Sequence, residues 1–478
     1  MKQQTVGGQV MTRYRWVICA LLFFATTINY MDRQVIALLQ PRLEEIFHWT
    51  DDDYGTIVAI FSLVYALSMI FVGRFVDKVG TKKGYAWAIG IWSLGACLHA
   101  LCGIAAEYAT GLDSTAALLT ASAALIPTIT TVSMVGFIIS RVVLAVGEAG
   151  NFPAAVKATA EYFPKRDRSF ATGIFNSGSN VGAILAPLSV PIIADRWGWE
   201  LAFIIVGALG FLWLIFWLLL YKSPEDNPKV NAAELAYINQ DLEDEEDAEK
   251  EAGGSGQPIS FWGCFKYRQT WSIFLGKFIT DGVWWFYLFW TPAYLKAEYN
   301  MGGTDIALPI GVLYSITVLG SVFGGKLPTY WFNKGYNAYD GRMKAMFYIA
   351  LCPLIVLLAQ PLGHIEALGN QAFWVPIIFI AIGAAAHQAW SANIFTAGSD
   401  MFPKKAVATI TGVTGLAGGL SSFLLNKGSG MLFDYSAEVW GSKAPGYAII
   451  FGFCALAYII AWCVMKLLVP KFKPITHL

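Results

Sequence analysis

The sequence predicts an all-α integral membrane protein with twelve transmembrane helices arranged as two bundles of six. Of its 478 residues, 56% are hydrophobic and only 14% are charged, and the mean hydropathy is +0.53. Soluble domains carry about 25% charged residues, so this chain has too little polar surface to cover a soluble globule. Its apolar residues are grouped in runs of the ~20 residues that a helix needs to cross a bilayer. Twelve such runs are centred near residues 27, 64, 94, 144, 182, 211, 281, 318, 351, 384, 418 and 457.

The composition argues against several other classes of protein. Basic and acidic residues number 33 each, so no excess of positive charge points to a nucleic-acid partner. The seven cysteines show no paired spacing, so we expect neither a disulfide framework nor a metal site, and no cofactor. The first apolar run contains Asp32 and Arg33 and lacks a small-residue cleavage site, which excludes a cleaved signal peptide. The runs also lack the alternation of membrane β-barrel strands.

The distribution of Lys and Arg predicts that both termini are cytoplasmic. In this orientation the inside segments hold 25 of the 33 basic residues, and three more lie within the membrane. Cytoplasmic loops of membrane proteins are rich in Lys and Arg, so this bias favours an even number of spans. The five basic residues in the outside loops are Arg42, Arg196, Lys296, Lys427 and Lys443.

Residues 114–130 are apolar, but Pro127 and several threonines interrupt them. If they crossed the membrane, every later loop would change sides, and the basic residues 165, 166 and 168 would lie outside, against the positive-inside bias. We therefore expect an extension on the outer side or a short interfacial helix.

A polar interval divides the chain into a six-helix bundle at residues 1–221, a cytoplasmic acidic linker at 222–262 and a second bundle at 263–478. From Asp241 to Glu251 the linker contains eight acids and one lysine, followed by a Gly- and Ser-rich stretch. This composition is typical of a solvated, partly helical spacer, which we favour over a regulatory element. In transporters with two such halves, the substrate site lies between them near the middle of the bilayer.

The loop between the second and third predicted helices has a distinctive pattern of small, acidic and basic residues. Gly73 is expected to allow close helix approach, and Asp77 to cap or pair with a neighbouring helix end. The basic residues favour the cytoplasmic side. This loop resembles the signature of the major facilitator superfamily, which implies that fold and a cytoplasmic gating motif. The motif residues are Gly73, Asp77, Lys78, Gly80, Lys82 and Lys83.

Six charged side chains fall inside apolar runs, where each costs at least ~2.5–3.5 kcal/mol on insertion scales. Two are adjacent in the first helix, two lie two turns apart on the fourth, and two lie one turn apart on the seventh, so the fourth and seventh helices each present their pair on one face. Structural ion pairs would explain some of these charges, but six exceed what helix packing requires. We therefore predict a common cavity. The six are Asp32, Arg33, Arg141, Glu148, Lys277 and Asp281.

These residue types suit the co-transport of an organic anion with protons. An arginine presents a planar fork that matches a carboxylate, and a carboxylate in a buried site can take up a proton. The sequence shows no nucleophile–base pairing, metal-ligand spacing or nucleotide loop, so we do not expect an enzyme.

Three local patterns resemble the anion:cation symporter family, which includes bacterial sugar-acid importers. They are Tyr30–Arg33, the segment from Arg141 through Gly147-Glu148-Ala149 to Phe152-Pro153-Ala154, and Glu161–Pro164 followed by Arg168-Ser169. Within that family, the chain is most similar to members that transport the hexuronates glucuronate and galacturonate. The features are Lys277-Phe278 with Asp281, residues 386–389, Ser399-Asp400, and residues 407–409 leading to Thr414-Gly415.

The resemblance implies a proton-coupled hexuronate importer that works by alternating access in the inner membrane of a bacterium. It assigns protonation to Asp32 and Glu148, and contact with the substrate carboxylate to Arg33 and Arg141. Relatives that import aldonates tend to have an amide at the position of Lys277, so we expect Lys277 to contact a carboxylate or ring oxygens, held by Asp281. A simple Lys277–Asp281 pair is the alternative. Gly415 departs from aldonate relatives, which carry a polar amide there.

Further candidates follow from the chemistry of sugars, whose rings present C–H faces to aromatic rings and hydroxyls to amides. We expect Tyr30, Tyr65, Gln388, Ser391 and Asn393 to contact the substrate. For His387, a packing role is favoured over a proton relay, so it is named only as a supporting residue.

Alternatives remain open at this point. The substrate could be another organic anion, such as an aldonate or dicarboxylate, and more distantly the chain could be a sensor that binds a sugar acid without translocating it. The expected partners are a small sugar-acid anion, protons and the lipid bilayer, with the chain as a monomer.

Overall fold

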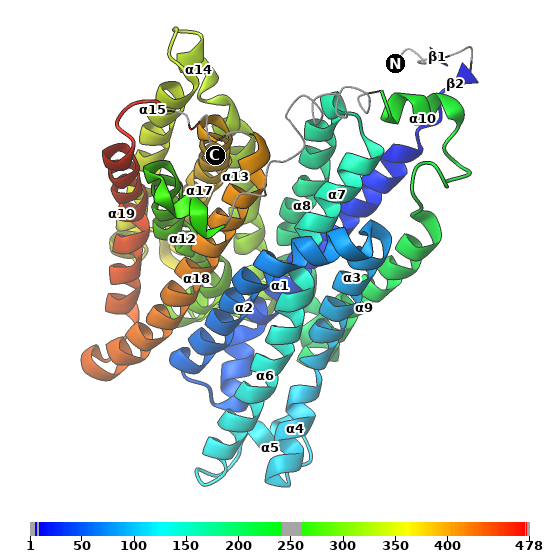
Figure 1. The fold of residues 1–478 in the computed structure, drawn as a ribbon. Coiled ribbons are helices and arrows are strands. Elements are labelled where there is room, and N and C mark those ends of the chain that lie inside the picture. The colour runs from blue at the N-terminus through cyan, green and yellow to red at the C-terminus, as the bar shows by residue number, and fades with distance from the viewer. Residues whose placement is uncertain (1–4, 7–8, 241–260, 403, 474, 476–478) are drawn as a thin grey trace.

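The structure, a computed structural model, describes the chain except for residues 1–4, 7–8, 241–260, 403, 474 and 476–478. Long helices dominate it, which confirms the predicted all-α fold (Figure 1). The helices of the two halves form two groups, and both termini lie at the same end of the molecule. We call this the terminal end, and the other the far end.

The first half begins with a two-stranded antiparallel hairpin, in which Thr5 is opposite Val10 and Val6 opposite Gln9. In its helices, α1 packs on α8 and α9, and α3 packs on α6 and α9. The elements are β1 (Thr5–Val6), β2 (Gln9–Val10), α1 (Tyr14–Phe47), α2 (Asp51–Val79), α3 (Thr81–Leu98), α4 (Leu101–Thr110), α5 (Thr115–Leu119), α6 (Ile126–Glu148), α7 (Asn151–Tyr162), α8 (Lys165–Trp197) and α9 (Trp199–Leu220).

In the second half, α12 packs on α18, α19 and α17, and α13 packs on α17. A short helix, α10 (Ala232–Ile238), precedes this half. The α-helices are α12 (Arg268–Tyr299), α13 (Ala307–Lys326), α14 (Thr329–Phe332), α15 (Ala338–Leu351), α16 (Ala359–Leu362), α17 (Trp374–Met401), α18 (Lys404–Trp440) and α19 (Ala444–Leu468). The 3-10 helices are η1 (Trp262–Lys266), η2 (Gly303–Ile306), η3 (Cys352–Leu358) and η4 (Glu366–Gln371).

In the described residues, eight helical segments are long and apolar enough to cross a membrane, or nine if the pair α3 and α4, bent by 41°, is counted as one span. The long helices α1, α12 and α18 are not among them. Charged residues occur inside α1 and α12, and they lower the mean hydropathy of these two helices. The predicted count of twelve spans and the cytoplasmic termini therefore stay predictions.

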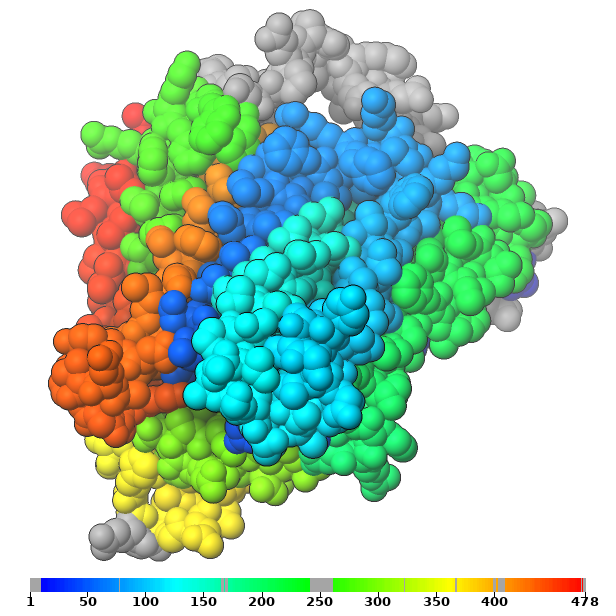
Figure 2. Space-filling model, turned by 90° about the horizontal axis from the view of Figure 1, so that it is seen from below, coloured from blue at the N-terminus to red at the C-terminus, as the bar shows by residue number. Residues whose placement is uncertain are grey.

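Residues 114–130 form the five-residue helix α5 and the first turn of α6, rather than a separate span. The side chain of Ser114 accepts a hydrogen bond from the N–H of Ala117 and so caps α5. Pro127 lies in the first turn of α6, where proline is tolerated because the first helical N–H groups have no partner. Together with α4, these elements project beyond the bundle at the far end, as expected of an extension (Figures 1 and 2).

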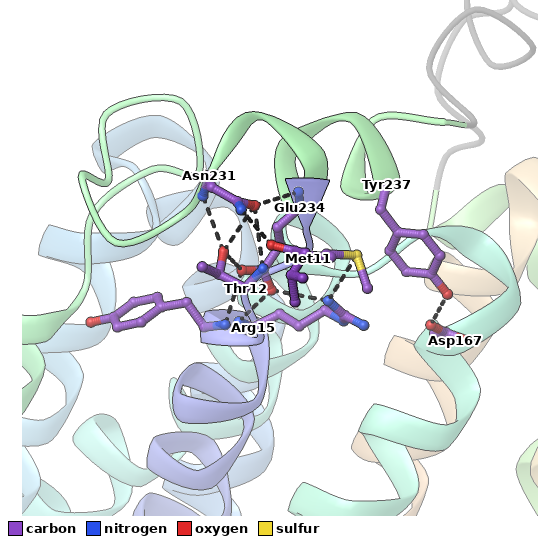
Figure 3. Close-up of polar contacts among 9 residues, drawn as sticks. Met11, Thr12, Arg15, Asp167, Asn231, Glu234 and Tyr237 are labelled. Atoms are coloured by element: carbon purple, nitrogen blue, oxygen red, sulfur yellow. Dashed lines mark hydrogen bonds and ion pairs between the residues drawn. The ribbon is translucent and has the colours of Figure 1, made fainter. Parts of the chain in front are cut away.

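Within residues 222–240 of the linker, α10 packs on the first half (Figure 3), and many of the other side chains are exposed. Glu234 of α10 is fully buried at the start of α1. Its carboxylate accepts hydrogen bonds from the backbone N–H groups of Tyr14 and Arg15, and it forms an ion pair of 3.0 Å with the Arg15 guanidinium. A carboxylate is stabilised there because the first N–H groups of a helix have no partner within it. The acidic run from Asp241 to Glu251 lies outside the described residues.

The two halves meet along a seam formed mainly by α2 and α18. Glycines bring the two backbones together. A Cβ atom on Gly430 would lie 2.4 Å from the carbonyl oxygen of Asp51, and one on Gly419 would lie 2.1 Å from the Cβ of Ala66. In the described residues, the last such approach toward the terminal end joins Gly415 to Met69. Beyond this point the two groups of helices spread apart (Figure 1).

Charged contacts join the halves at the far end. Lys443, in the turn between α18 and α19, forms an ion pair of 2.6 Å with Asp51, and Asp434 accepts hydrogen bonds from the first backbone N–H groups of α2. Lys296 forms a further pair of 3.0 Å with Glu45. Burial disfavours the charged form of Lys443, but the neighbouring Asp51 and Glu44 outweigh it, and its pKa is raised. Viewed from this end, the start of α2 lies between the end of α18 and the extension (Figure 2).

Replacing Gly430 with alanine should destabilise this seam. Its Cβ would collide with backbone atoms of residue 51, which cannot move aside as a flexible side chain can. Overpacking of this kind costs about 1–3 kcal/mol, so the thermal midpoint of the purified protein should fall. Gly428 on the same helix is the matched control, because nothing lies within 4 Å of its added Cβ. Equal midpoints for the two alanine variants would contradict the close packing described here.

Candidate substrate and proton-binding site

An ion pair between Arg33 and Glu148 forms the centre of the candidate site. Arg33 lies near the middle of α1, and Glu148 is the last residue of α6. The Nε and Nη2 atoms of Arg33 donate to Glu148 Oε2 at 2.9 and 2.7 Å. Both side chains are buried, so each charge depends on the other for stabilisation in place of water. Glu148 Oε1 has no hydrogen-bond partner among the described residues and remains able to accept one.

Local packing explains why Glu148 reaches across to α1. A Cβ on Gly147 would lie 2.3 Å from the backbone nitrogen of Trp92, so this glycine lets the end of α6 pack directly against α3. A Cβ on Gly150 would likewise lie 2.6 Å from Ala88. The close approach of α6 to α3 therefore sets the position of the carboxylate.

Four aromatic rings surround the guanidinium of Arg33. The distances from its Cζ atom to the ring centroids are 4.8 Å for Tyr65, 4.9 Å for Trp285, 5.1 Å for Tyr30 and 5.7 Å for Phe61. Cations are attracted to the faces of aromatic rings at such distances. Trp285 belongs to α12, so this group spans the seam between the two halves.

Arg141 and Asp32 lie beside this pair without partners of their own. The Arg141 side chain is completely buried, and none of its three guanidinium nitrogens has a hydrogen-bond partner in the described chain. Both carboxylate oxygens of Asp32 are likewise unpartnered among the described residues. Arg141 interacts electrostatically with Glu148 and Asp32, and its Cζ lies 5.0 Å from the Phe61 ring. A buried arginine with five unused N–H groups keeps its full capacity to donate hydrogen bonds to an anionic partner.

In the second half, Lys277 and Asp281 form an ion pair of 2.8 Å along α12. The Lys277 ammonium also lies 3.3 Å from Ser391 Oγ and 4.4 Å from the ring of Phe395, both on α17. A Cβ on Gly418 would lie 2.4 Å from Asp281 Oδ2, so the glycine makes space for this carboxylate. Asp281 thus holds Lys277, as the sequence predicts, and Lys277 points at α17.

The six charges therefore form two groups rather than one contiguous cluster. Asp32, Arg33, Arg141 and Glu148 belong to the first half, and Lys277 with Asp281 to the second. Trp285 connects them, because it lies one helical turn beyond Asp281 on the same face of α12 and contacts Arg33. In the described residues, no ion pair or hydrogen bond joins a charge of one group directly to a charge of the other.

Of the other residues predicted in the second half, some lie near Lys277 and others pack against neighbouring helices. Ser391 contacts Lys277, and Gln388 is half-buried on the same helix. Asn393 faces elsewhere: its amide donates to the carbonyl oxygens of Gly324 and Ala389 and accepts from Arg342. His387 stacks on Trp284 and is hydrogen-bonded to the hydroxyl of Tyr458 at 2.9 Å, which is a packing role.

The predicted gating motif lies at the terminal end, on the turn between α2 and α3. Gly80 has φ of +88°, a backbone conformation that favours glycine and allows the two helices to join without a longer loop. The close approach expected at Gly73 is not made, because nothing lies within 4 Å of a Cβ built there. The reason is that the halves diverge at this end. The carbonyl of Lys82 accepts from Trp217, Lys78 and Lys83 are exposed, and the side chain of Asp77 is outside the description.

Sequence reasoning missed three aromatic residues of the site. Phe61 lies between Arg33 and Arg141, and Phe395 lies over Lys277. Trp285 lies over the guanidinium of Arg33. The signal for two of them was helical spacing: Phe61 precedes Tyr65 by one turn, and Trp285 follows Asp281 by one turn.

Comparison with known proteins identifies the family. The sequence profile of the Major Facilitator Superfamily matches residues 22–425. The chain belongs to the Major Facilitator Superfamily. This confirms the family predicted from the loop after α2 and from the charged helices, and it makes the chain a membrane transporter rather than an enzyme.

Named relatives cover most of the chain. The hexuronate transporter of Escherichia coli K12 is 30% identical over 455 residues, which are 95% of this chain and 94% of that protein. The galacturonate transporter of Dickeya chrysanthemi is 31% identical over 314 residues, covering 66% of this chain and 81% of that protein. The D-galactonate transporter of E. coli O6:H1 is 25% identical over 459 residues, covering 94% and 95%.

Solved structures share the fold of this superfamily member. A bacterial homologue of the lysosomal transporter Spinster, inward-facing and unoccupied, matches with a TM-score of 0.67 and 20% identity over 96% of this chain and 98% of that chain. The xylose transporter of E. coli, partially occluded and inward-open, matches with a TM-score of 0.69 and 14% identity over 97% and 100%.

Proposed function

We propose that this transporter is a proton-coupled importer of a sugar-acid anion, most specifically a hexuronate such as glucuronate or galacturonate. The observation that carries the proposal is Arg141, a fully buried guanidinium without a hydrogen-bond partner in the described chain, beside the equally unpartnered Asp32. Removing two such groups from water is costly unless something pairs with them. A carboxylate substrate pairs with Arg141, and a proton neutralises Asp32.

The proposed coupling works through the ion pair of Arg33 and Glu148. When a proton neutralises Glu148, the attraction that holds Arg33 weakens, and the guanidinium becomes available to the substrate carboxylate. The substrate in turn replaces Glu148 as the partner of Arg33, which favours the protonated carboxyl group. Proton binding and anion binding therefore strengthen each other, as coupling between two sites must be reciprocal.

The proposed movement is a rocking of the two halves, residues 1–221 and 263–478, around this central site, with residues 222–262 as the connection. Close approaches of glycines across the seam run from the far end to Met69 and Gly415, and the described residues show none farther toward the terminal end. This arrangement supports access to the site from the terminal end, which we assign to the cytoplasm of a bacterial cell. The far end then faces outward across the inner membrane, and the chain acts as a monomer.

The number of protons decides which gradient drives the import. One proton moving with a monovalent sugar acid is electrically neutral, so only the pH gradient contributes. With two protons, the cycle carries one net positive charge and gains about 2.3 kcal/mol per 100 mV of membrane potential. This is roughly forty-fold more accumulation, since ~1.4 kcal/mol corresponds to tenfold. Two candidate carboxylates, Asp32 and Glu148, are available for the second case.

The choice of hexuronate rests on relatives and on Lys277. The relatives that cover most of this chain include proteins named as hexuronate and galactonate transporters, and a galacturonate transporter covers two thirds of it. Lys277 adds a third cation to the two arginines, on the opposite side of the seam, and its contact with Ser391 directs it toward α17. A cation at this position suits an additional oxygen of an oxidised sugar, as the resemblance to the hexuronate type implies.

Replacing Glu148 with glutamine should separate exchange from accumulation. In proteoliposomes with an imposed pH gradient, the variant should lose uphill accumulation of labelled glucuronate, because the proton site is gone. Counterflow exchange of the same label should persist, because exchange needs no net proton transfer. Asp113→Asn, which changes an exposed acid near the extension, is the control and should accumulate normally. If the pH gradient still drives accumulation of glucuronate in Glu148→Gln, this residue has no part in the mechanism.

Replacing Arg141 with lysine should weaken substrate binding at least about tenfold, because an ammonium cannot form the two parallel hydrogen bonds of a guanidinium. Binding of glucuronate to the purified protein is measured by calorimetry. Arg196→Lys, at an exposed position of α8, is the control and should bind like the wild type. Wild-type affinity in Arg141→Lys would refute a substrate-binding role.

Replacing Lys277 with glutamine should reduce the preference for hexuronates over aldonates. Inhibition of labelled glucuronate uptake by unlabelled galacturonate and gluconate measures this preference directly. We expect the ratio of the two inhibition constants to shift toward gluconate by about tenfold, the loss of one charge-assisted hydrogen bond. Lys466→Gln, which breaks an ion pair outside the site, should leave the ratio unchanged. An unchanged ratio in Lys277→Gln would show that Lys277 serves only as the partner of Asp281.

A further inference from the structure

A cavity of about 500 Å³ lies at the terminal end of the second half, apart from the proposed transport site. It is formed between the start of α12 and the segment that follows α19. Its lining comes from residues 266–269 and from residues 468–471, 473 and 475.

The charge of this cavity is entirely positive. Its lining includes the four basic residues Lys266, Arg268, Lys471 and Lys473, and no acidic residue. In the described part of the chain, none of the four forms an ion pair, whereas the nearby Lys466 pairs with Asp340 at 3.3 Å. Four like charges around one cavity repel each other unless an anion lies among them.

Hydrogen bonds to three separate helices build the wall of this cavity. The segment after α19 turns back across the end of the bundle, where Tyr339 of α15 donates to the carbonyl of Val469 at 2.6 Å and Gln269 of α12 donates to that of Lys473 at 2.8 Å. The N–H of Ile475 donates to the carbonyl of Met401 in α17 at 2.9 Å. The basic segment is therefore held in place, and the cavity is a built feature rather than a loose tail.

The surroundings of the cavity place it at the boundary between lipid and water. The helix α12 begins at this cavity and α19 ends at it. Large apolar side chains next to the lining residues are strongly exposed: Leu467 is 78% exposed, Trp262 73% and Trp271 41%. Tryptophan is enriched at the interfaces of membranes, where it contacts both headgroups and acyl chains.

We infer that this cavity binds the phosphate of an anionic phospholipid headgroup from the cytoplasmic leaflet. The four basic side chains contact the phosphate, and the exposed Leu467 and Trp271 provide an apolar surface for the acyl chains. Basic pockets between transmembrane helices on the cytoplasmic side bind anionic headgroups in this way. A soluble phosphate would pair with the basic side chains but would leave the neighbouring apolar surface uncovered.

The test measures lipid binding to the full-length purified protein. Native mass spectrometry counts bound phosphatidylglycerol after delipidation and titration, with phosphatidylcholine and inorganic phosphate as the comparison ligands. We expect phosphatidylglycerol to bind and the other two not to bind. Lys471→Gln/Lys473→Gln should bind it at least about tenfold more weakly, because each basic residue near the membrane surface contributes to attraction of anionic lipid. Lys326→Gln/Lys334→Gln, two exposed lysines at the same end, is the charge-matched control and should bind normally.

Three results would overturn the inference. If Lys326→Gln/Lys334→Gln weakened phosphatidylglycerol binding as much as Lys471→Gln/Lys473→Gln, only the overall charge of this end would matter. Inorganic phosphate that displaces or matches the lipid would identify a site for soluble phosphate. Binding of phosphatidylglycerol only after neutralisation of the acids at residues 241–251 would show that the chain's own acidic segment is the occupant.

Discussion

The ion pair between Arg33 and Glu148 is the interaction on which the centre of this transporter depends. Two opposite charges buried among apolar helices are tolerable only while they hold each other, because each one alone would lack both water and a partner. The pair connects α1 to the end of α6, and the aromatic rings around Arg33 extend this connection to α12 in the other half. A change in the charge of Glu148 therefore alters the contacts of Arg33 on both sides of the seam between the two halves.

The seam itself shows how such a change can be converted into movement. At the far end, glycines bring the α2 and α18 backbones into contact, and ion pairs lock the same region. At the terminal end, the turn around Gly80 joins α2 to α3, and nothing lies within 4 Å of a Cβ built on Gly73 or Gly80. In the proposed rocking movement, the halves stay in contact at the closely packed end and change their separation at the other. Small and charged residues along α2 and α18 supply the contacts of the closely packed end.

Much of this architecture could be predicted from the sequence, because helices in lipid require long apolar runs, and buried charges stand out against them. The charged residues of the site, the Lys277–Asp281 pair and the nature of residues 114–130 all followed from spacing and composition. Contacts between distant helices could not be predicted in the same way. Nothing in the local sequence shows that Glu148 pairs with Arg33 rather than with Arg141 on its own helix, or that Asn393 faces α13 and α15. These outcomes depend on how helices are rotated and packed, which is set by small residues such as Gly147 that bring backbones together.

The docking of Glu234 onto the start of α1 has a consequence for the order in which the chain is assembled. The first N–H groups of α1 obtain this partner only after residues 231–237 have left the ribosome, more than two hundred residues later. At that moment the second half has not yet been synthesised. The contact that closes this end of the first half can therefore form before the later helices assemble against it.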